Sequence, residues 1–187
     1  GIVQSDAKGL GLIVADFLND GGLEIYVGND TVANFFFVKS GVSEDGTPTY
    51  TEEATIRGIA YNGNGQAQAT MGISVADLNQ DGLLDLFSTN FYEDANTLYL
   101  QTAEHYFEDR TRDANLYDAS FYMLGFGCQF LDATRTGTFD IAITNGHVDR
   151  SFATGEPDRM HPQYFQPDGT SRFVESNRES MGAYFSE

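Results

Sequence analysis

The sequence predicts an all-β fold, a β-propeller built of four-stranded antiparallel blades, with three blades in this chain. Three observations support the prediction. An acidic loop that contains glycine recurs three times in one frame, and short apolar runs with strand composition surround each copy. No stretch shows a helical period over the roughly ten residues that a helix requires. Closed propellers have about four to eight blades, so we expect a partial propeller or one that a partner completes.

The repeated frame is built around an aspartate. Each aspartate has a glycine five residues before it, a glycine five residues after it, an acid at the eighth residue and an asparagine five residues beyond that acid. The aspartates are Asp16, Asp77 and Asp132; the glycines are Gly11, Gly72 and Gly127, then Gly21, Gly82 and Gly137; the acids are Glu24, Asp85 and Asp140; the asparagines are Asn29, Asn90 and Asn145. An internal period of this kind indicates stacked units that bury their faces against one another.

Each repeat contains four runs that read as strands. They cover residues 9–16, 23–27, 34–38 and 49–53, then 71–77, 83–89, 96–101 and 105–111, then 124–132, 139–145, 162–166 and 172–176. We expect one propeller segment over residues 1–187, with blades at about 9–57, 71–113 and 124–176. Glycine in each first strand suits a place where neighbouring blades approach closely. The insert at 149–162 contains two prolines and is predicted to be a loop.

The loop of the second repeat is the strongest candidate metal site. Side-chain oxygens stand at loop positions 1, 3, 5 and 9, and Gly82 at position 6 permits a sharp turn. The predicted ligands are Asp77, Asn79, Asp81 and Asp85 through their side chains and Leu83 through its carbonyl oxygen. Calcium takes about six to eight oxygen ligands, so the loop predicts a Ca²⁺ site. An acidic hairpin turn without metal is the alternative.

The other two loops depart from this frame. In the first repeat, position 3 is Leu18, and the remaining candidate ligands are Asp16, Asp20, Glu24 and the carbonyl oxygen of Gly22. In the third repeat, Thr134 and Thr136 stand at positions 3 and 5. Because hydroxyl groups are poor substitutes for carboxylates, we expect the third loop to be structural and free of metal.

Three segments of the chain resemble FG-GAP/VCBS repeats: GLGLIVADFLNDGGLEIYVGND, MGISVADLNQDGLLDLFSTNF and GFGCQFLDATRTGTFDIAITNGHVD. The runs NGHV at 145–148 and MGAYF at 181–185 resemble the ASPIC/UnbV-type group, which includes cartilage acidic protein. The resemblance implies a propeller with calcium-binding turns that serves recognition or scaffolding. It also implies an extracellular, periplasmic or cell-surface location. It brings no catalytic residues, and the family usually has more blades.

Composition limits the class of partner. The chain has 28 acidic and 10 basic residues, which give a net charge of −18. Binding to nucleic acid or to an anionic membrane depends on Lys and Arg, so this balance argues against both and favours cations or a basic partner. No apolar run is long enough for membrane insertion. The single cysteine, Cys128, cannot form an internal disulfide and is expected to be a small buried residue.

Catalytic motifs are weak throughout the sequence. His105, His147 and His161 match no zinc spacing, no serine lies in a nucleophile elbow, and no two carboxylates stand out as an acid–base pair. Aromatic residues that lie in connections could line a recognition surface; they are Tyr61, Tyr92, Tyr117, Tyr122 and Phe152. Enzymatic activity is therefore left open, and a non-enzymatic role is favoured.

Two functions remain in view. The first is a non-enzymatic, calcium-binding module for protein–protein recognition or scaffolding, such as an accessory subunit or an adhesion-type domain. The alternative is a carbohydrate-binding or carbohydrate-active propeller in which calcium holds the loops. Such a site requires exposed aromatic residues that converge with carboxylates on one face.

Three blades leave two outer sheet faces without a neighbour. We expect both faces to be apolar and to be covered by another polypeptide or by a second copy. The residues expected there are Ile13, Val14, Phe17 and Tyr26 at one end and Phe139, Ile141, Tyr164 and Phe173 at the other. The three-blade count, the start at Gly1 and the turn-like ending FSE also predict that the chain is a piece: a truncated product, a proteolytic fragment, or one subunit whose arc another chain completes.

Overall fold

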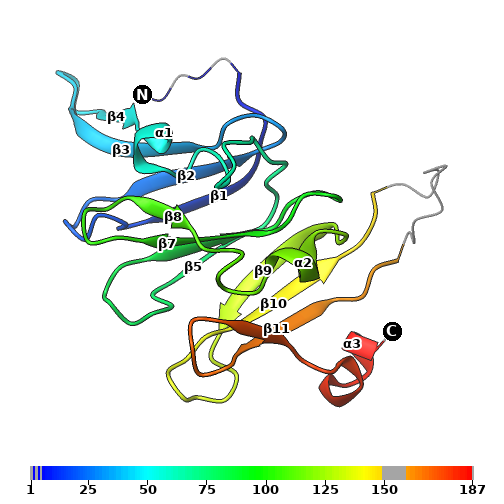
Figure 1. Cartoon of the computed structure of the whole chain (residues 1–187). Helices are drawn as coiled ribbons and strands as arrows, with labels where there is room; N and C mark the ends of the chain where they lie inside the picture. Colours follow the sequence, from blue (N-terminus) through cyan, green and yellow to red (C-terminus); the bar gives the residue numbers. More distant parts are fainter. Residues whose placement is uncertain (1, 3, 5, 149–158, 187) are drawn as a thin grey trace.

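The computed structural model describes residues 2, 4, 6–148 and 159–186, and its fold is all-β. Within this part, three four-stranded antiparallel sheets follow one another along the chain (Figure 1). In each sheet, consecutive strands pair as neighbours in a simple meander. The predicted all-β class and the four-stranded antiparallel sheets are confirmed.

The strands lie close to the predicted runs. In these runs, alternate side chains point to opposite faces of the sheet, which suits sheets packed face to face. The first sheet contains β1 (Gly9–Ala15), β2 (Glu24–Asn29), β3 (Phe35–Val42) and β4 (Pro48–Glu52). The second contains β5 (Ile73–Ala76), β6 (Asp85–Ser88), β7 (Thr97–Gln101) and β8 (Phe107–Asp109). The third contains β9 (Gly125–Leu131), β10 (Asp140–Asn145), β11 (Gln163–Pro167) and β12 (Phe173–Glu175).

Helices are limited to single turns between or after the strands. They are α1 (Ala54–Arg57), α2 (Tyr117–Ser120), the 3-10 turn η1 (Arg178–Met181) and α3 (Ala183–Ser186). Four residues are too few to show a helical period, so the sequence did not indicate them. No helix in the described part of the chain is long and apolar enough to cross a membrane. Most of the predicted loop at 149–162 lies outside the described residues.

Two apolar layers join the three sheets. Between the first and second sheets, Phe17, Tyr26 and Phe36 pack against Leu86, Tyr99 and Phe107. Between the second and third sheets, Phe87, Leu98 and Leu116 pack against Phe130, Ile141, Ile143, Phe165 and Phe173. The first strands of adjacent sheets also lie beside each other, β1 against β5 and β5 against β9. The sheets therefore form a sequential stack with its first strands together.

The first strands approach one another most closely at the repeated glycines. A β-carbon built on Gly11 would lie 2.5 Å from the Met71 carbonyl oxygen, and one on Gly72 would lie 1.9 Å from that of Phe126. These two contacts confirm the predicted close approach. Gly127 is followed by no further sheet in the described part, and its nearest neighbour would be the Thr144 hydroxyl at 3.1 Å.

The outer face of the first sheet is apolar, but the prediction was wrong for three of the four residues expected there. Phe17 and Tyr26 are 1% and 0% exposed, and Ile13 packs against the same layer, which faces the second sheet. Val14 does lie outside, together with Leu12, and the two are 46% and 64% exposed. The error arose because neighbouring strand residues point to opposite faces, and both faces of this sheet carry apolar residues.

The outer face of the third sheet is less apolar than expected, because Gln129, Thr144 and Gln166 are exposed there beside Val174. Ile141 and Phe173 are buried against the second sheet, and Phe139 packs on the same layer. Tyr164 faces outward, but it is only 6% exposed because the Phe185 ring of α3 lies over it, with 5.9 Å between ring centroids. Figure 1 shows α3 at the end of the chain beside β11. The two ends of the stack thus differ.

Candidate functional site

The three acidic loops share one hairpin geometry. In each loop the carboxylate of the leading aspartate accepts hydrogen bonds from the backbone N–H groups four and five residues later, at 2.8–3.1 Å. Asp16 binds Asp20 and Gly21, Asp77 binds Asp81 and Gly82, and Asp132 binds Thr136 and Gly137. The leading aspartate therefore closes each turn, including the third loop, which was expected to be free of metal.

Two residues of each loop have left-handed backbone conformation. The predicted glycines Gly21, Gly82 and Gly137 have φ of 82°, 88° and 83°. Two residues before them, Asn19, Gln80 and Arg135 have φ of 54°, 61° and 56°. The second set was not predicted, because Gln and Arg carry no sequence preference for this region. The shared backbone places the first, third and fifth loop residues at one turn.

In the second loop, three predicted ligands lie together. The Asn79 side-chain nitrogen donates to the Asp81 carboxylate at 2.9 Å, and the other Asp81 oxygen accepts from the Leu83 N–H at 2.9 Å. The Asn79 and Asp77 side-chain oxygens both lie within hydrogen-bond distance of the Asp81 N–H, at 3.1 Å and 3.0 Å. Asn79 and Asp81 are exposed, so an ion could reach this group from solvent.

Asp85 differs because it lies beneath the loop and is fully buried. One carboxylate oxygen accepts from the Leu78 N–H and the other from the Gln101 N–H, each at 2.9 Å. Burial raises the pKa of Asp85 to about 6. The negative charges of Asp81 and Asp77 also raise this pKa, whereas the two N–H hydrogen bonds lower it. A nearby cation would favour the charged form of this carboxylate.

The first loop offers fewer oxygens. The Asp20 carboxylate accepts from the Gly22 N–H at 2.7 Å, and Glu24 accepts from the N–H groups of Phe17 and Leu18 at 2.9 Å and 3.2 Å. Glu24 is buried, and this burial raises its pKa. Glu24 thus has the same position beneath its loop as Asp85, while Leu18 supplies no side-chain oxygen.

The third loop replaces the carboxylates with hydroxyl groups. The Thr136 hydroxyl lies 3.1 Å from that of Thr134 and 2.8 Å from that of Thr138. Asp140 accepts a 2.5 Å hydrogen bond from the Tyr164 hydroxyl. This loop therefore places hydroxyl groups where the second loop has an amide and a carboxylate.

The second loop has the donor chemistry of a calcium site. Among the described residues, no three His, Cys, Asp or Glu side chains converge as a metal-holding group. A site here would therefore also need the Asn79 amide and the Leu83 carbonyl. These donors are all oxygens, which suits calcium. Each carboxylate oxygen has two lone pairs, so one that accepts an N–H bond can still contact a cation.

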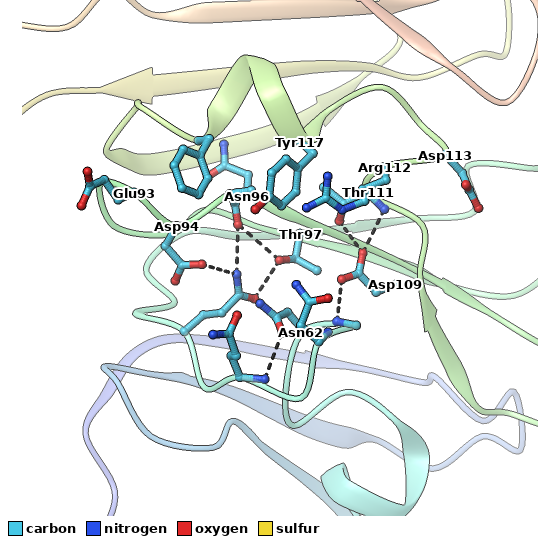
Figure 2. Close-up of a pocket in the computed structure, with 16 residues that line it drawn as sticks. Asn62, Glu93, Asp94, Asn96, Thr97, Asp109, Thr111, Arg112, Asp113 and Tyr117 are labelled. Carbon is cyan, nitrogen blue, oxygen red and sulfur yellow. Dashed lines mark hydrogen bonds between the residues drawn. The ribbon is translucent and has the colours of Figure 1, made fainter.

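A second candidate site is a polar cavity of about 290 Å³ beside the connections between sheets (Figure 2). Gln68 donates to Asp94 at 2.7 Å, and the Gly63 N–H donates to Asp109 at 2.7 Å. Burial raises the pKa of Asp94. On another wall, the Arg112 guanidinium lies 3.4 Å from the centre of the Tyr117 ring. Carboxylates and an aromatic ring from distant segments thus meet in one cavity.

Aromatic residues of the connections form a cluster beside this cavity. Tyr117 stacks on Phe121 at 5.6 Å between centroids, Phe121 meets Tyr122 at 4.9 Å, and Tyr122 meets Tyr92 at 5.9 Å. The sequence indicated Tyr92, Tyr117 and Tyr122 but missed Phe121. Tyr61 also lies in a connection and is 38% exposed, whereas Phe152 lies outside the described residues.

Asn96, at the edge of the cavity, has an unpaired amide nitrogen. It is fully buried, and its side-chain nitrogen has no hydrogen-bond partner among the described residues. The equivalent Asn34 of the first sheet donates to the Tyr26 hydroxyl at 2.8 Å and to the Thr70 hydroxyl at 3.2 Å. Phe87 stands at the position of Tyr26 and Gly125 at that of Thr70, so neither hydroxyl is present around Asn96.

Comparison with known proteins identifies no family. No protein-family model matches the chain, and no curated protein matches it. Function is therefore inferred from the repeat frame and the geometry of the loops.

Proposed function

We propose that this chain is a calcium-stabilised segment of an FG-GAP/VCBS-type β-propeller that serves protein–protein recognition or scaffolding without catalysis. In this view it is an accessory subunit or an adhesion-type domain of the ASPIC/UnbV kind, outside the cytoplasm or on the cell surface. The three sheets support the proposal because they have the same meander and stack with their first strands adjacent, as propeller blades do. The location rests on the resemblance alone.

The observation that carries the recognition role is the exposed outer face of the first sheet. Leu12 and Val14 are 64% and 46% exposed there. At the same repeat positions, Ile73 and Val75 of the second sheet pack against the apolar layer shared with the first sheet. The face of Leu12 and Val14 is thus suited to another sheet, from a second polypeptide or a second copy. Burying a large apolar side chain contributes roughly 1.5–3 kcal/mol, so several such residues would drive association.

The association test compares the two outer faces. Sedimentation velocity at micromolar concentration should detect self-association of the wild-type chain, and Leu12→Lys should abolish it because a charge would be buried in an apolar contact. Gln129→Lys, at an exposed position on the outer face of the third sheet, should leave association unchanged. A monodisperse 20.6 kDa monomer would contradict association between copies and leave only a different polypeptide as the partner.

Calcium has a structural role in this proposal. Asp77, Asn79 and Asp81 would supply side-chain oxygens, Leu83 its carbonyl oxygen, and Asp85 the innermost carboxylate. Asp16, Asp20, Gly22 and Glu24 would form a weaker site in the first loop. Support comes from the exposed oxygen groups of the second loop, which a cation could reach from solvent.

The calcium test uses a matched pair at loop position 5. At a free calcium concentration 100 times the Kd, binding stabilises the folded state by about 2.7 kcal/mol. For a chain of this size, that stabilisation raises Tm by roughly 5–10 °C. Asp81→Ala should lose this rise, whereas Thr136→Ala in the third loop should keep it. In EDTA, neither the wild-type chain nor Thr136→Ala should show the rise. A wild-type Tm that does not respond to calcium would remove the metal from the proposal.

Carbohydrate binding is the second candidate, and the polar cavity favours it. Asp94, Asp109 and Tyr117 line one cavity, the combination of carboxylates with an aromatic ring that sugar recognition requires (Figure 2). A glycan array with the wild-type chain tests this function. Binding that Tyr117→Ala abolishes and that Tyr184→Ala preserves would support it, because Tyr184 is absent from this cavity. An array without binding would reject it and leave the scaffolding role untouched.

A further inference from the structure

The interface between the second and third sheets contains an apolar cleft of about 420 Å³. Its apolar wall includes Leu78, Leu98, Leu100, Phe139 and Phe173, and its rim includes Asn79, Gln80, Thr138, Thr170 and Ser171. None of the described residues that line the cleft is charged, although the chain has a net charge of −18. The cleft is thus a neutral site on a strongly acidic protein.

The first interface shows what fills the corresponding space between the first and second sheets. Phe17, Phe36 and Phe107 meet there in mutual edge-to-face contact, with ring centroids 5.3 Å, 6.1 Å and 5.9 Å apart. They are 1%, 0% and 4% exposed. Three aromatic rings therefore close the first interface, in an edge-to-face arrangement that aromatic pairs favour.

The second interface has leucines at two of these three positions. Leu78 follows Asp77 as Phe17 follows Asp16. Leu98 pairs with Phe87 in the strand register as Phe36 pairs with Tyr26. Phe173 keeps its ring at the position of Phe107.

The leucines leave the second interface partly open. Leu78, Leu100 and Phe139 are only partly buried at the edge of the apolar layer. Their exposed surfaces form the wall of the cleft. A void lined by apolar groups loses dispersion contacts and favours an apolar occupant.

We propose that this cleft binds a small neutral aromatic molecule. Its ring would lie against Leu78, Leu98 and Phe173, in the place that phenyl groups occupy in the first interface. Its polar substituent would lie at the rim, where amide and hydroxyl groups offer hydrogen bonds. The absence of charged lining residues selects a neutral ligand, because an ionised group would lose hydration without gaining a partner.

Titration with indole, followed by NMR of ¹³C-labelled leucine methyl groups, tests the proposal. The methyl resonances of Leu78, Leu98 and Leu100 should shift saturably. Leu78→Phe introduces the ring found at the equivalent Phe17 and should weaken indole binding at least about tenfold, which corresponds to about 1.4 kcal/mol. Leu98→Phe, which introduces the ring found at the equivalent Phe36, should do the same and replaces the first variant if that one folds poorly.

The matched control is Phe17→Leu, which makes the first interface resemble the second. It should leave the indole affinity of the Leu78 cleft within about twofold of wild type, because the two sites have separate walls. Shifts confined to the cleft and lost in Leu78→Phe would support the site. An indole response that never saturates, that spreads over the surface, or that both leucine-to-phenylalanine variants preserve would overturn it.

Discussion

The first and second sheets meet through three phenyl rings and a fully bonded asparagine, Asn34. The second and third sheets meet through Leu78, Leu98 and Asn96, whose amide nitrogen is unpaired among the described residues. Both interfaces use the same repeat positions and the same backbone turns. The repeat therefore fixes how the sheets stack, whereas single side chains decide how well each interface is filled and hydrogen-bonded.

The interfaces also differ in the bonds that cross them. The Gln101 side chain of the second sheet donates to the Phe17 carbonyl at 3.0 Å, and the Asp85 carboxylate holds the Gln101 N–H. At the corresponding place in the third sheet stands Pro167, which has no N–H to donate. The Asp85 carboxylate is thus linked through Gln101 to the first interface. The second interface lacks the equivalent link.

The largest expected effect comes from Gly72→Ala, which would break the second interface. The new methyl group would lie 1.9 Å from the Phe126 carbonyl oxygen, so the sheets must move apart. We expect a loss of about 3 kcal/mol or more in the free energy of unfolding. Urea unfolding of Gly127→Ala is the control; its nearest contact is 3.1 Å, and it should lose about 1 kcal/mol or less. Equal losses would refute the role of the close approach.

The next effect is a pH dependence of the first interface in metal-free protein. The pKa of Asp85 is about 6 in the folded state, against an ordinary value of 3.8. The folded state therefore holds this proton more tightly, so stability falls as pH rises through this range. Relative to Asp85→Asn, wild type should lose on the order of 2 kcal/mol between about pH 4 and pH 7 in urea unfolding with EDTA. A constant difference would contradict the raised pKa.

A smaller effect should follow when the hydroxyl difference between the interfaces is exchanged. Phe87→Tyr places a hydroxyl where Tyr26 has one in the first sheet, and it should bond the unpaired Asn96 amide and stabilise the fold by about 1 kcal/mol. Tyr26→Phe should lower the free energy of unfolding by about 1–2 kcal/mol, since it removes the hydroxyl to which the Asn34 side chain donates. Thermal unfolding distinguishes the two signs. Destabilisation by Phe87→Tyr would show that the second interface has no room for the hydroxyl.

The smallest expected effect is that of Gln80→Ala. The Gln80 side chain donates to the Gly137 carbonyl at 2.8 Å and so links the second and third loops in an exposed position. Its removal should cost about 0.5 kcal/mol in urea unfolding, because water replaces the exposed bond. A loss three times larger would mean that the loops, and not only the apolar layers, hold the second interface together.

Much of the fold could be predicted from the sequence because the repeat supplies three readings of one pattern. The strands and the left-handed glycines at Gly21, Gly82 and Gly137 were found in this way. The face to which a strand residue points was harder to predict. Ile13 and Val14 are both apolar neighbours, and only the position of the second sheet decides that Ile13 packs inward while Val14 is exposed.

The candidate sites also differ in how far the sequence could predict them. The acidic loops are local in sequence, so the grouping of Asp77, Asn79 and Asp81 followed from their spacing. The polar cavity joins Gly63 and Asp109 across 46 residues, and no local pattern indicates such a meeting. The complete burial of Asp85 could not be predicted either, because it depends on strands on both sides of this residue.

The helix α3 has a consequence for how copies of this chain can assemble. Contacts between unlike faces, repeated from copy to copy, produce open fibres when the rotation does not close. The Phe185 ring over Tyr164 covers part of the third sheet, while the face of Leu12 and Val14 stays open. If copies associate through the face of Leu12 and Val14, the partial cover on the third sheet favours contact between like faces over contact between unlike faces. Contact between two such like faces would end at a two-fold symmetric pair and would not grow into a fibre.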